Sequence, residues 1–297
     1  MPIVLDVNIV RHLAEGEIPV AWLYDLRNEG ITVHIGEGSA VELVGQLLQG
    51  RFAWDRWLKV RRVLREVLHF RQPVLLGREV RNRRSVFALP HQPEHSAGNA
   101  AYFHRVRYSW LSVMGAQRPE DLLRPFRVPP TGEDAVLGLP NVTATTEKTR
   151  QSWADAFEGL KNARLGDRNR QVVADLREED FFENMVVGFA REIDAATPDG
   201  KPPESVRWDA VVRVMVLFTS RSLRRKHPYN VGKNLNDAFD FDLLRYLAVP
   251  AAICTLDRRI KSALIDAGAW QAKWLVTPDS LLTWAGRQIV ADLRWPA

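Results

Sequence analysis

Hydrophobic and polar positions follow two different patterns in the first fifty residues of the chain. Residues 3–8 form a short apolar run that ends in polar groups, and residues 31–35 alternate and are rich in β-branched side chains. Both patterns predict β-strands. After residue 38 the apolar positions take helical spacing, and Ser39 is predicted to cap this helix. Glu42 is then expected in the first helical turn.

The same two patterns return near the C-terminus. The spacing predicts a helix over residues 237–247, a strand over 251–255, a helix over 258–266, a strand near 274–276 and a further helix from about Pro278. Strands that alternate with helices in this way favour a parallel sheet covered by helices. We therefore predict an α/β fold.

The middle of the chain is predicted to be mostly helical. Residues 54–70 have the spacing of a basic amphipathic helix, and further helices are expected at about 147–163, 178–195 and 204–225. Proline and glycine recur through residues 85–146, which predicts short helices joined by turns. The sequence thus indicates a sheet domain made of residues 1–50 and 230–297, with residues 51–229 as a helical insertion partly packed on its core.

Composition narrows the class of protein. The chain has 297 residues, of which 46% are hydrophobic, so it can bury a sizeable core. Its apolar runs fall short of the roughly 18–20 residues of a membrane-spanning helix, and its start lacks the pattern of a signal peptide. A single cysteine, Cys254, excludes an internal disulfide and is predicted to be a buried strand residue. We expect a cytoplasmic protein without a membrane partner.

Acidic residues stand at the ends of several predicted elements. Asp6 ends the first strand, Glu42 lies at the start of a helix, and Asp257 follows the strand over 251–255. Asp237 opens its helix, and Asp240 lies on nearly the same helical face. The carboxyl ends of parallel strands open into one crevice, so four or five of these acids are expected to converge there.

Converging carboxylates suggest a divalent cation. Their charges repel one another, whereas Mg²⁺ or Mn²⁺ supplies positive charge and prefers hard oxygen ligands. Such an ion supports hydrolysis of a phosphodiester. Each acid on its own also fits a solvated helix cap, so it is their joint placement that favours a metal site.

Four segments resemble the PIN-domain nucleases, which include the VapC-type toxins of toxin and antitoxin pairs. They are residues 4–8 (Val-Leu-Asp-Val-Asn), 39–43 (Ser-Ala-Val-Glu-Leu), 236–240 (Asn-Asp-Ala-Phe-Asp) and 254–258 (Cys-Thr-Leu-Asp-Arg). The resemblance covers roughly residues 1–50 and 230–290. It implies a PIN-like sheet and Mg²⁺ or Mn²⁺ bound by Asp6, Glu42, Asp257 and either Asp237 or Asp240. Asn8 and Thr255 would support these acids.

Positive charge is concentrated beside the first of these segments. The formal net charge is +5, yet residues 51–84 hold eleven Arg or Lys against three Asp or Glu. This concentration favours contact with a nucleic-acid backbone, although a solvated helix face is an equal alternative. The candidate contacts are Arg61, Arg62, Arg65, Arg81, Arg83 and Arg84, together with a second cluster of Arg221, Arg224, Arg225 and Lys226.

The resulting hypothesis is a metal-dependent endoribonuclease in a toxin or defence setting, with DNA as the alternative substrate. A cognate antitoxin or other protein partner and a homo-oligomer are both compatible with it. The rival is a catalytically inactive PIN-like module that binds nucleic acid or protein. A phosphatase of the haloacid-dehalogenase class is disfavoured because that class expects Asp where this chain has Asn8, and the Asp240 and Asp242 pair only weakly resembles a topoisomerase-primase acid pair.

Overall fold

The computed structural model of the chain describes residues 2–71, 73–75, 97–129, 132–136, 147–148, 150–155, 158, 178–195, 204–223, 230, 233–234, 237–248 and 251–294. Its centre is a five-stranded sheet in the order β3-β2-β1-β6-β7. The strands are β1 (Pro2–Leu5), β2 (Thr32–Gly36), β3 (Val74–Leu75), β6 (Ala252–Cys254) and β7 (Leu275–Val276), and all neighbouring pairs are parallel. The predicted α/β class with a parallel sheet is confirmed.

The middle strand β1 is buried on both faces. Its residues Ile3, Val4 and Leu5 have no exposed surface, as expected for a parallel sheet covered by helices. In register, Leu5 lies opposite Ile35 of β2 on one side and Cys254 of β6 on the other. Cys254 is fully buried, which confirms its prediction as a strand residue. Strand order reverses beside β1, so the carboxyl ends of β1 and β6 border the crevice where ligands bind in such sheets.

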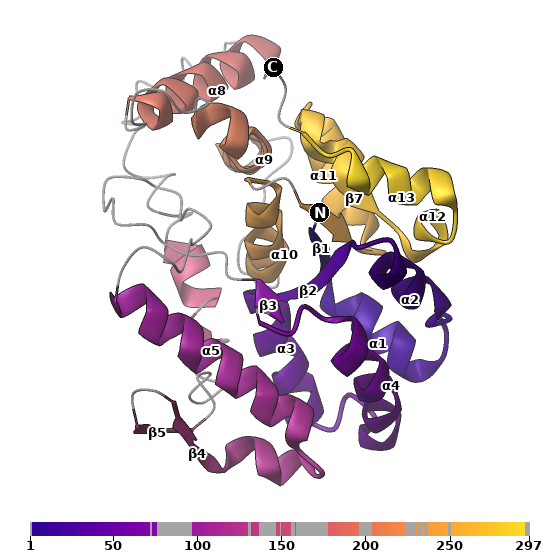
Figure 1. Cartoon of the computed structure of the whole chain (residues 1–297). Helices are drawn as coiled ribbons and strands as arrows, with labels where there is room; N and C mark the ends of the chain where they lie inside the picture. The colour runs from indigo at the N-terminus through magenta and orange to yellow at the C-terminus, as the bar shows by residue number, and fades with distance from the viewer. Residues whose placement is uncertain are drawn as a thin grey trace.

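Helices of both sequence segments cover this sheet. Residues 1–50 supply α1 (Val7–Glu15), α2 (Ala21–Asn28) and α3 (Glu37–Leu48), and α4 (Trp54–Val67), from the segment predicted as an insertion, packs beside α1. The C-terminal part supplies α10 (Asp237–Leu244), the 3₁₀ helix η4 (Arg245–Ala248), α11 (Arg258–Asp266), η5 (Trp270–Trp274), α12 (Pro278–Leu281) and α13 (Trp284–Ala291). Figure 1 shows α1, α2 and α4 grouped on one side of β1 and β2, with α3 and α10 on the other.

The segment between these parts contributes further elements, of which the longest are helices. They are α5 (Ala97–Gly115), the 3₁₀ helix η2 (Pro119–Leu123), the hairpin β4 (Pro125–Val128) and β5 (Glu133–Val136), α8 (Glu178–Asp194) and α9 (Glu204–Leu223). In Figure 1, α8 and α9 lie together above α10. None of the helices that the structure describes is both long and apolar enough to cross a membrane.

Several predicted elements need correction. The 19-residue helix α5 and the β4–β5 hairpin replace the short helices expected over residues 85–146. The first strand ends at Leu5 instead of continuing to Asn8, because Asp6 caps α1 and turns the chain into a helix. The helix expected over residues 237–247 is α10 followed by η4, and β3 adds a strand that the sequence did not predict.

Tyr246 connects three elements beneath the sheet edge. Its hydroxyl donates to the carbonyl of Leu75 in β3 at 2.6 Å and accepts from the backbone N–H of Glu37, the first residue of α3, at 2.8 Å. The side chain is almost completely buried. This single hydroxyl therefore satisfies backbone groups at the end of one strand and the start of one helix.

Tyr246→Phe is expected to lower the free energy of unfolding by about 1–3 kcal/mol, because it leaves one donor and one acceptor without their partner. Chemical denaturation followed by circular dichroism measures the change. Tyr24→Phe, at a partly buried position on α2, is the matched control and should cost less. Equal losses for the two variants would show that the Tyr246 hydroxyl contributes nothing specific.

Candidate functional site

Asp6 lies at the carboxyl end of the middle strand. It is the N-cap of α1, and its carboxylate accepts from the backbone N–H of Asn8 at 3.5 Å and from Nδ2 of Asn8 at 3.4 Å. Only 6% of Asp6 is exposed. Burial raises the pKa of Asp6, while the hydrogen bonds from Thr255 and Asn8 lower it and the charge of Asp257 adds a smaller increase.

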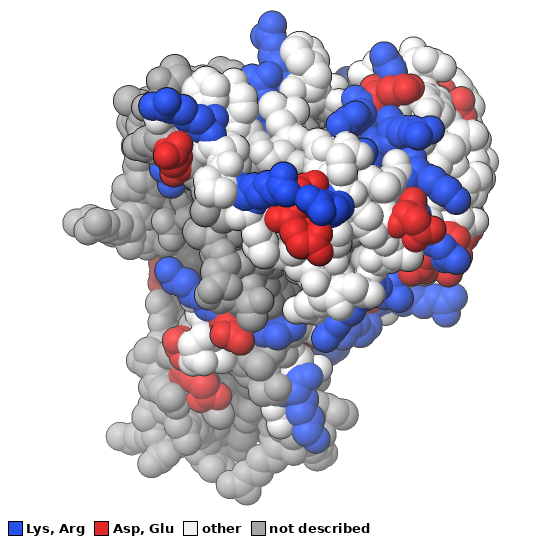
Figure 2. All heavy atoms as spheres, turned by 90° about the horizontal axis from the view of Figure 1, so that it is seen from below, with Lys and Arg blue, Asp and Glu red and all other residues white. Residues whose placement is uncertain are grey.

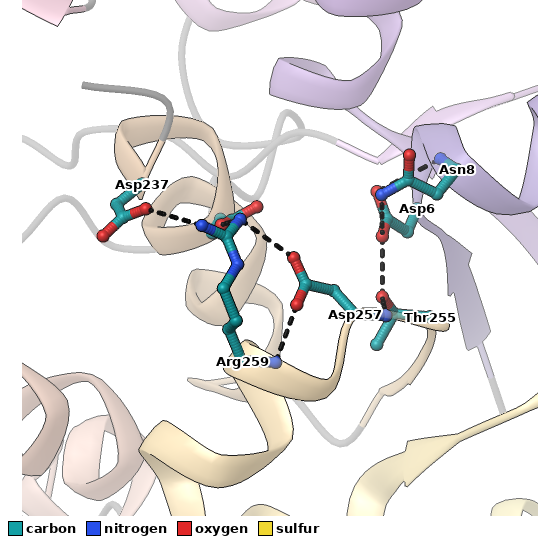
Figure 3. A network of polar contacts seen from close by, with 7 residues as sticks. Asp6, Asn8, Asp237, Thr255, Asp257 and Arg259 are labelled. Carbon is teal, nitrogen blue, oxygen red and sulfur yellow. Dashed lines mark hydrogen bonds and ion pairs between the residues drawn. The ribbon is translucent and has the colours of Figure 1, made fainter. Parts of the chain in front are cut away.

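Thr255 joins the ends of β1 and β6. Its hydroxyl donates to Oδ2 of Asp6 at 2.6 Å, and Oγ1 of Thr255 accepts from the backbone N–H of Asp257 at 3.0 Å. Asp257 caps α11 and accepts from the backbone N–H of Arg259 at 2.7 Å. In Figure 3 a dashed line joins Thr255 to Asp6, and Asp257 lies beside them. The Thr-x-Asp spacing therefore fixes the position of Asp257 relative to Asp6.

Glu42 lies on α3, and its place in the helix differs from the prediction. The helix begins at Glu37, directly after β2, so Glu42 is beyond the first turn, and Ser39 is buried inside the helix instead of capping it. Helix starts leave backbone N–H groups without intrahelical partners. Here Tyr246 and Asp242 supply those partners, the latter through a bond from the Gly38 N–H at 3.2 Å, so no capping side chain is required within α3.

The pKa of Glu42 is raised to about 7, first by burial and then by the charge of Asp6. Two contacts oppose this increase: Nε2 of Gln46 donates to Oε1 of Glu42 at 3.0 Å, and the charge of Arg150 lowers the pKa. The effect of Asp6 shows that the carboxylates at the ends of β1 and on α3 interact electrostatically. Glu42 thus belongs to the same acidic cluster as Asp6.

Asp240 on α10 has a similar environment. Its pKa is raised to about 7 by burial and then by the charge of Asp257, and the charges of Asp6 and Asp237 add to the increase, while Arg259 lowers it. The charges of Asp6 and Asp257 therefore act on Asp240, and the charge of Asp6 acts on Glu42. We call these four residues the acidic cluster: Asp6, Glu42, Asp240 and Asp257.

Arg259 provides the positive charge next to this cluster. Nη2 of its guanidinium lies 3.1 Å from Oδ2 of Asp240 and 3.1 Å from Oδ2 of Asp257, and Nη1 lies 3.5 Å from Oδ1 of Asp237. Figure 3 shows the guanidinium directed toward these carboxylates from the start of α11. Sequence reasoning did not select Arg259. The sequence feature that could have indicated its role is its position two residues after Asp257, which caps α11.

The acidic cluster is looser than a closed metal site. Within the part of the chain that the structure describes, the group whose ligand atoms all lie within 4.8 Å of one another is His12, Glu15 and Glu17 at the end of α1. The predicted acids do not form such a group. Their carboxylates are instead drawn toward Asn8, Thr255, Gln46 and Arg259.

Asp242 does not belong to the acidic cluster, although it is only two residues after Asp240 in the sequence. It is directed toward α3, where it accepts from Gly38, and it pairs with Arg245 at 2.8 Å. Gly38 is required here, since a Cβ atom would lie 2.7 Å from Oδ2 of Asp242. The two aspartates of the Asp-x-Asp sequence therefore serve different elements, which does not support the topoisomerase-primase comparison.

The basic residues predicted to contact nucleic acid differ in their burial and in their hydrogen-bond and ion-pair partners. Arg61 is buried and donates to the carbonyl of Ala116, and Arg65 donates to the carbonyl of Met114, so both arginines hold α4 against the end of α5. Arg62 is exposed, and Arg221 pairs with Asp266 at 2.9 Å. Arg81, Arg83, Arg84, Arg224, Arg225 and Lys226 lie outside the described residues.

Figure 2 shows the described surface from below, where basic side chains stand beside acidic ones at several places. The described residues include exposed ion pairs such as that of Arg124 with Asp121, at 3.2 Å. Exposed pairs of this kind contribute little stability and do not form a continuous positive surface. The face seen in Figure 2 therefore does not by itself identify a nucleic-acid contact.

The raised pKa of Glu42 predicts a dependence of stability on pH. The folded protein holds a proton on Glu42 that the unfolded chain releases near the ordinary glutamate pKa of 4.5, so stability is lost as pH rises from about 4.5 to about 7. Glu42→Gln removes this loss. At pH 8, without divalent cations, we expect the variant to gain about 2 kcal/mol in free energy of unfolding over the wild type, and at pH 4.5 almost nothing.

Denaturant unfolding at both pH values measures this difference. Glu179→Gln, at an exposed position on α8, is the control and should behave as the wild type. If Mg²⁺ or Mn²⁺ binds the cluster, it should stabilise the wild type at pH 8 more than Glu42→Gln. A gain that is the same at both pH values would contradict the assignment of a raised pKa to Glu42.

Comparisons with family models, with curated proteins and with solved structures gave no match.

Proposed function

We propose that this protein is a metal-dependent endonuclease with a PIN-like catalytic domain, and that RNA is its substrate. The observation that carries the proposal is the hydrogen-bonded link from Asp6 through Thr255 to Asp257, together with the Arg259 guanidinium shared by Asp257 and Asp240, at the carboxyl ends of β1 and β6. These residues come from distant parts of the sequence. Their proximity is the arrangement that the resemblance to PIN-domain nucleases implies.

The donor set fits Mg²⁺ or Mn²⁺. All four side chains offer carboxylate oxygens, which these hard cations prefer, and a Cys- or His-rich set for zinc is absent from the cluster. The raised pKa values of Glu42 and Asp240 show that buried negative charge here is incompletely compensated. Asp6, Glu42, Asp240 and Asp257 would hold the ion, which would activate water and stabilise charge on the phosphodiester.

The chain's own residues have separate roles in this proposal. Thr255 and Asn8 hold Asp6 in one orientation, and Gln46 does the same for Glu42. Arg259 compensates the charge of Asp240 and Asp257 when substrate is not bound. Because 67% of its side chain is exposed, Arg259 can turn toward a phosphate oxygen and release the carboxylates.

The test is cleavage of end-labelled single-stranded RNA and DNA by purified protein with Mg²⁺, with Mn²⁺ or with EDTA. Endonucleolytic products that require the cation and disappear in the Asp6→Asn variant support the proposal. RNA cut faster than DNA of the same sequence supports the choice of substrate. Binding without cleavage under every cation condition would favour the alternative, a PIN-like module that binds nucleic acid without turnover.

A further inference from the structure

A cavity of about 440 Å³ opens beside the acidic cluster, between α9, α10 and α11. Its size falls within the range of small-molecule sites in proteins. Asp240 and Arg259, which belong to the acidic cluster and its counter-charge, also line this cavity. A group held in the cavity would therefore be next to the proposed site of cleavage.

The walls of the cavity are apolar and the ends are charged. The side chains of Val214 and Phe218 from α9, Phe241 and Leu244 from α10, and Ile260 and Ala263 from α11 form the walls. At one end Arg221 pairs with Asp266 at 2.9 Å across α9 and α11, and at the other Arg259 pairs with Asp240 at 3.1 Å across α11 and α10. The result is an apolar slot with an ion pair near each end of α11.

The aromatic walls have a fixed position. The ring of Trp153 packs against Phe241 with centroids 4.8 Å apart and meets Phe218 edge-on at 6.4 Å. Phe241 is buried, whereas Phe218 is only partly buried. A flat aromatic ligand can therefore be held against Phe218 without a rearrangement of the Trp153 contact.

We propose that this cavity binds one unpaired nucleobase of the strand whose backbone passes the acidic cluster, an inference that rests on the proposed function. A nucleobase is flat and has two apolar faces, which suit the apolar slot, and a polar edge, which suits the paired charges at its ends. Arg258 and Arg259 on the rim suit the phosphate that follows the base. The cavity would thus select single-stranded substrate at one position next to the cut.

The experiment uses a single-stranded RNA with one abasic nucleotide placed in turn at each position around the cut. The wild type is expected to cleave one member of the series about tenfold more slowly than the rest, because one base loses its stacking contact. Ser262→Trp adds an indole at an exposed position that lines the cavity, and it should remove this dependence on position. Phe218→Leu keeps an apolar wall without a ring and should weaken the dependence.

Ile265→Trp is the matched control, since Ile265 is exposed on the same helix and does not line the cavity. It should keep the dependence of the wild type. An equal rate for every abasic position in the wild type, or a dependence that persists in Ser262→Trp, would overturn the base pocket while leaving the nuclease proposal intact.

Equilibrium binding of the same RNA series, measured by fluorescence anisotropy in EDTA, separates the two proposals. If no cation supports cleavage but one abasic position weakens binding about tenfold, and Ser262→Trp abolishes that difference, the nuclease proposal fails and the base pocket stands. If binding is absent or indifferent to every abasic position, the base pocket is wrong whatever the cleavage assay shows.

Discussion

Asp6→Asn is expected to reduce kcat/KM for metal-dependent RNA cleavage by about a thousandfold. The substitution keeps the size of the side chain and its ability to accept a hydrogen bond from Asn8, but it removes the negative charge at the centre of the acidic cluster. Loss of one carboxylate ligand costs several kcal/mol of transition-state stabilisation, and each 1.36 kcal/mol corresponds to a factor of ten.

Two controls make this expectation specific. Asp292→Asn carries the same chemical change at an exposed position after α13 and should retain wild-type activity. Circular dichroism and thermal unfolding establish that Asp6→Asn is folded. The variant should also lower the pKa of Glu42, because the charge of Asp6 contributes to its increase. Cleavage at the wild-type rate by folded Asp6→Asn would exclude a metal site built on the acidic cluster.

Substitutions of Asp240 and Asp237, between which the sequence could not choose, are expected to have very different effects on kcat/KM. Asp240 interacts electrostatically with both Asp6 and Asp257, whereas Oδ1 of Asp237 lies 3.5 Å from Nη1 of Arg259, the counter-charge of the cluster. Asp240→Asn is therefore expected to lower kcat/KM by about a hundredfold or more. Asp237→Asn weakens an ion pair with a largely exposed arginine and should cost a fewfold at most.

Steady-state cleavage of one RNA by the two variants at several Mn²⁺ concentrations tests this assignment. Excess Mn²⁺ should partly restore Asp240→Asn if its defect is in cation binding, and it should leave Asp237→Asn unchanged. Each variant is the matched control of the other, because both lie in the first turn of α10 and both carry the same substitution. A larger loss in Asp237→Asn would reverse the assignment.

The strands and helices near the two ends of the chain could be predicted from the sequence, because their hydrophobic patterns and capping residues agree with the observed burial. β1 and β6 are short apolar runs, β2 alternates and is rich in β-branched residues, and α11 follows a capping aspartate at Asp257. The same signals placed Asp6 and Asp257 at strand ends. In contrast, β3 consists of two residues, too few for any alternation to appear, and its place in the sheet is set by the backbone of β2 and by Tyr246.

The start of α3 and the role of Arg259 could not be predicted for a related reason. Ser39 has the right side chain for a cap, but the free N–H groups at the start of α3 are bound by Tyr246 and Asp242, which lie about two hundred positions away. Arg259 pairs with Asp240 from another helix. Contacts between distant segments decide both cases, and local periodicity contains no information about them.

The hydrogen bond between Thr255 and Asp6 spans 249 positions of the chain. Its two residues end neighbouring strands, yet one is synthesised long before the other. A ribosome-bound chain that has emerged only as far as α9 would have Asp6 and Glu42 but neither Asp240 nor Asp257. Such late closure also implies slow folding, since distant pairings must wait for the intervening chain to become ordered. Under the proposed function, this order of events would keep the nascent polypeptide from cutting the transcript being translated.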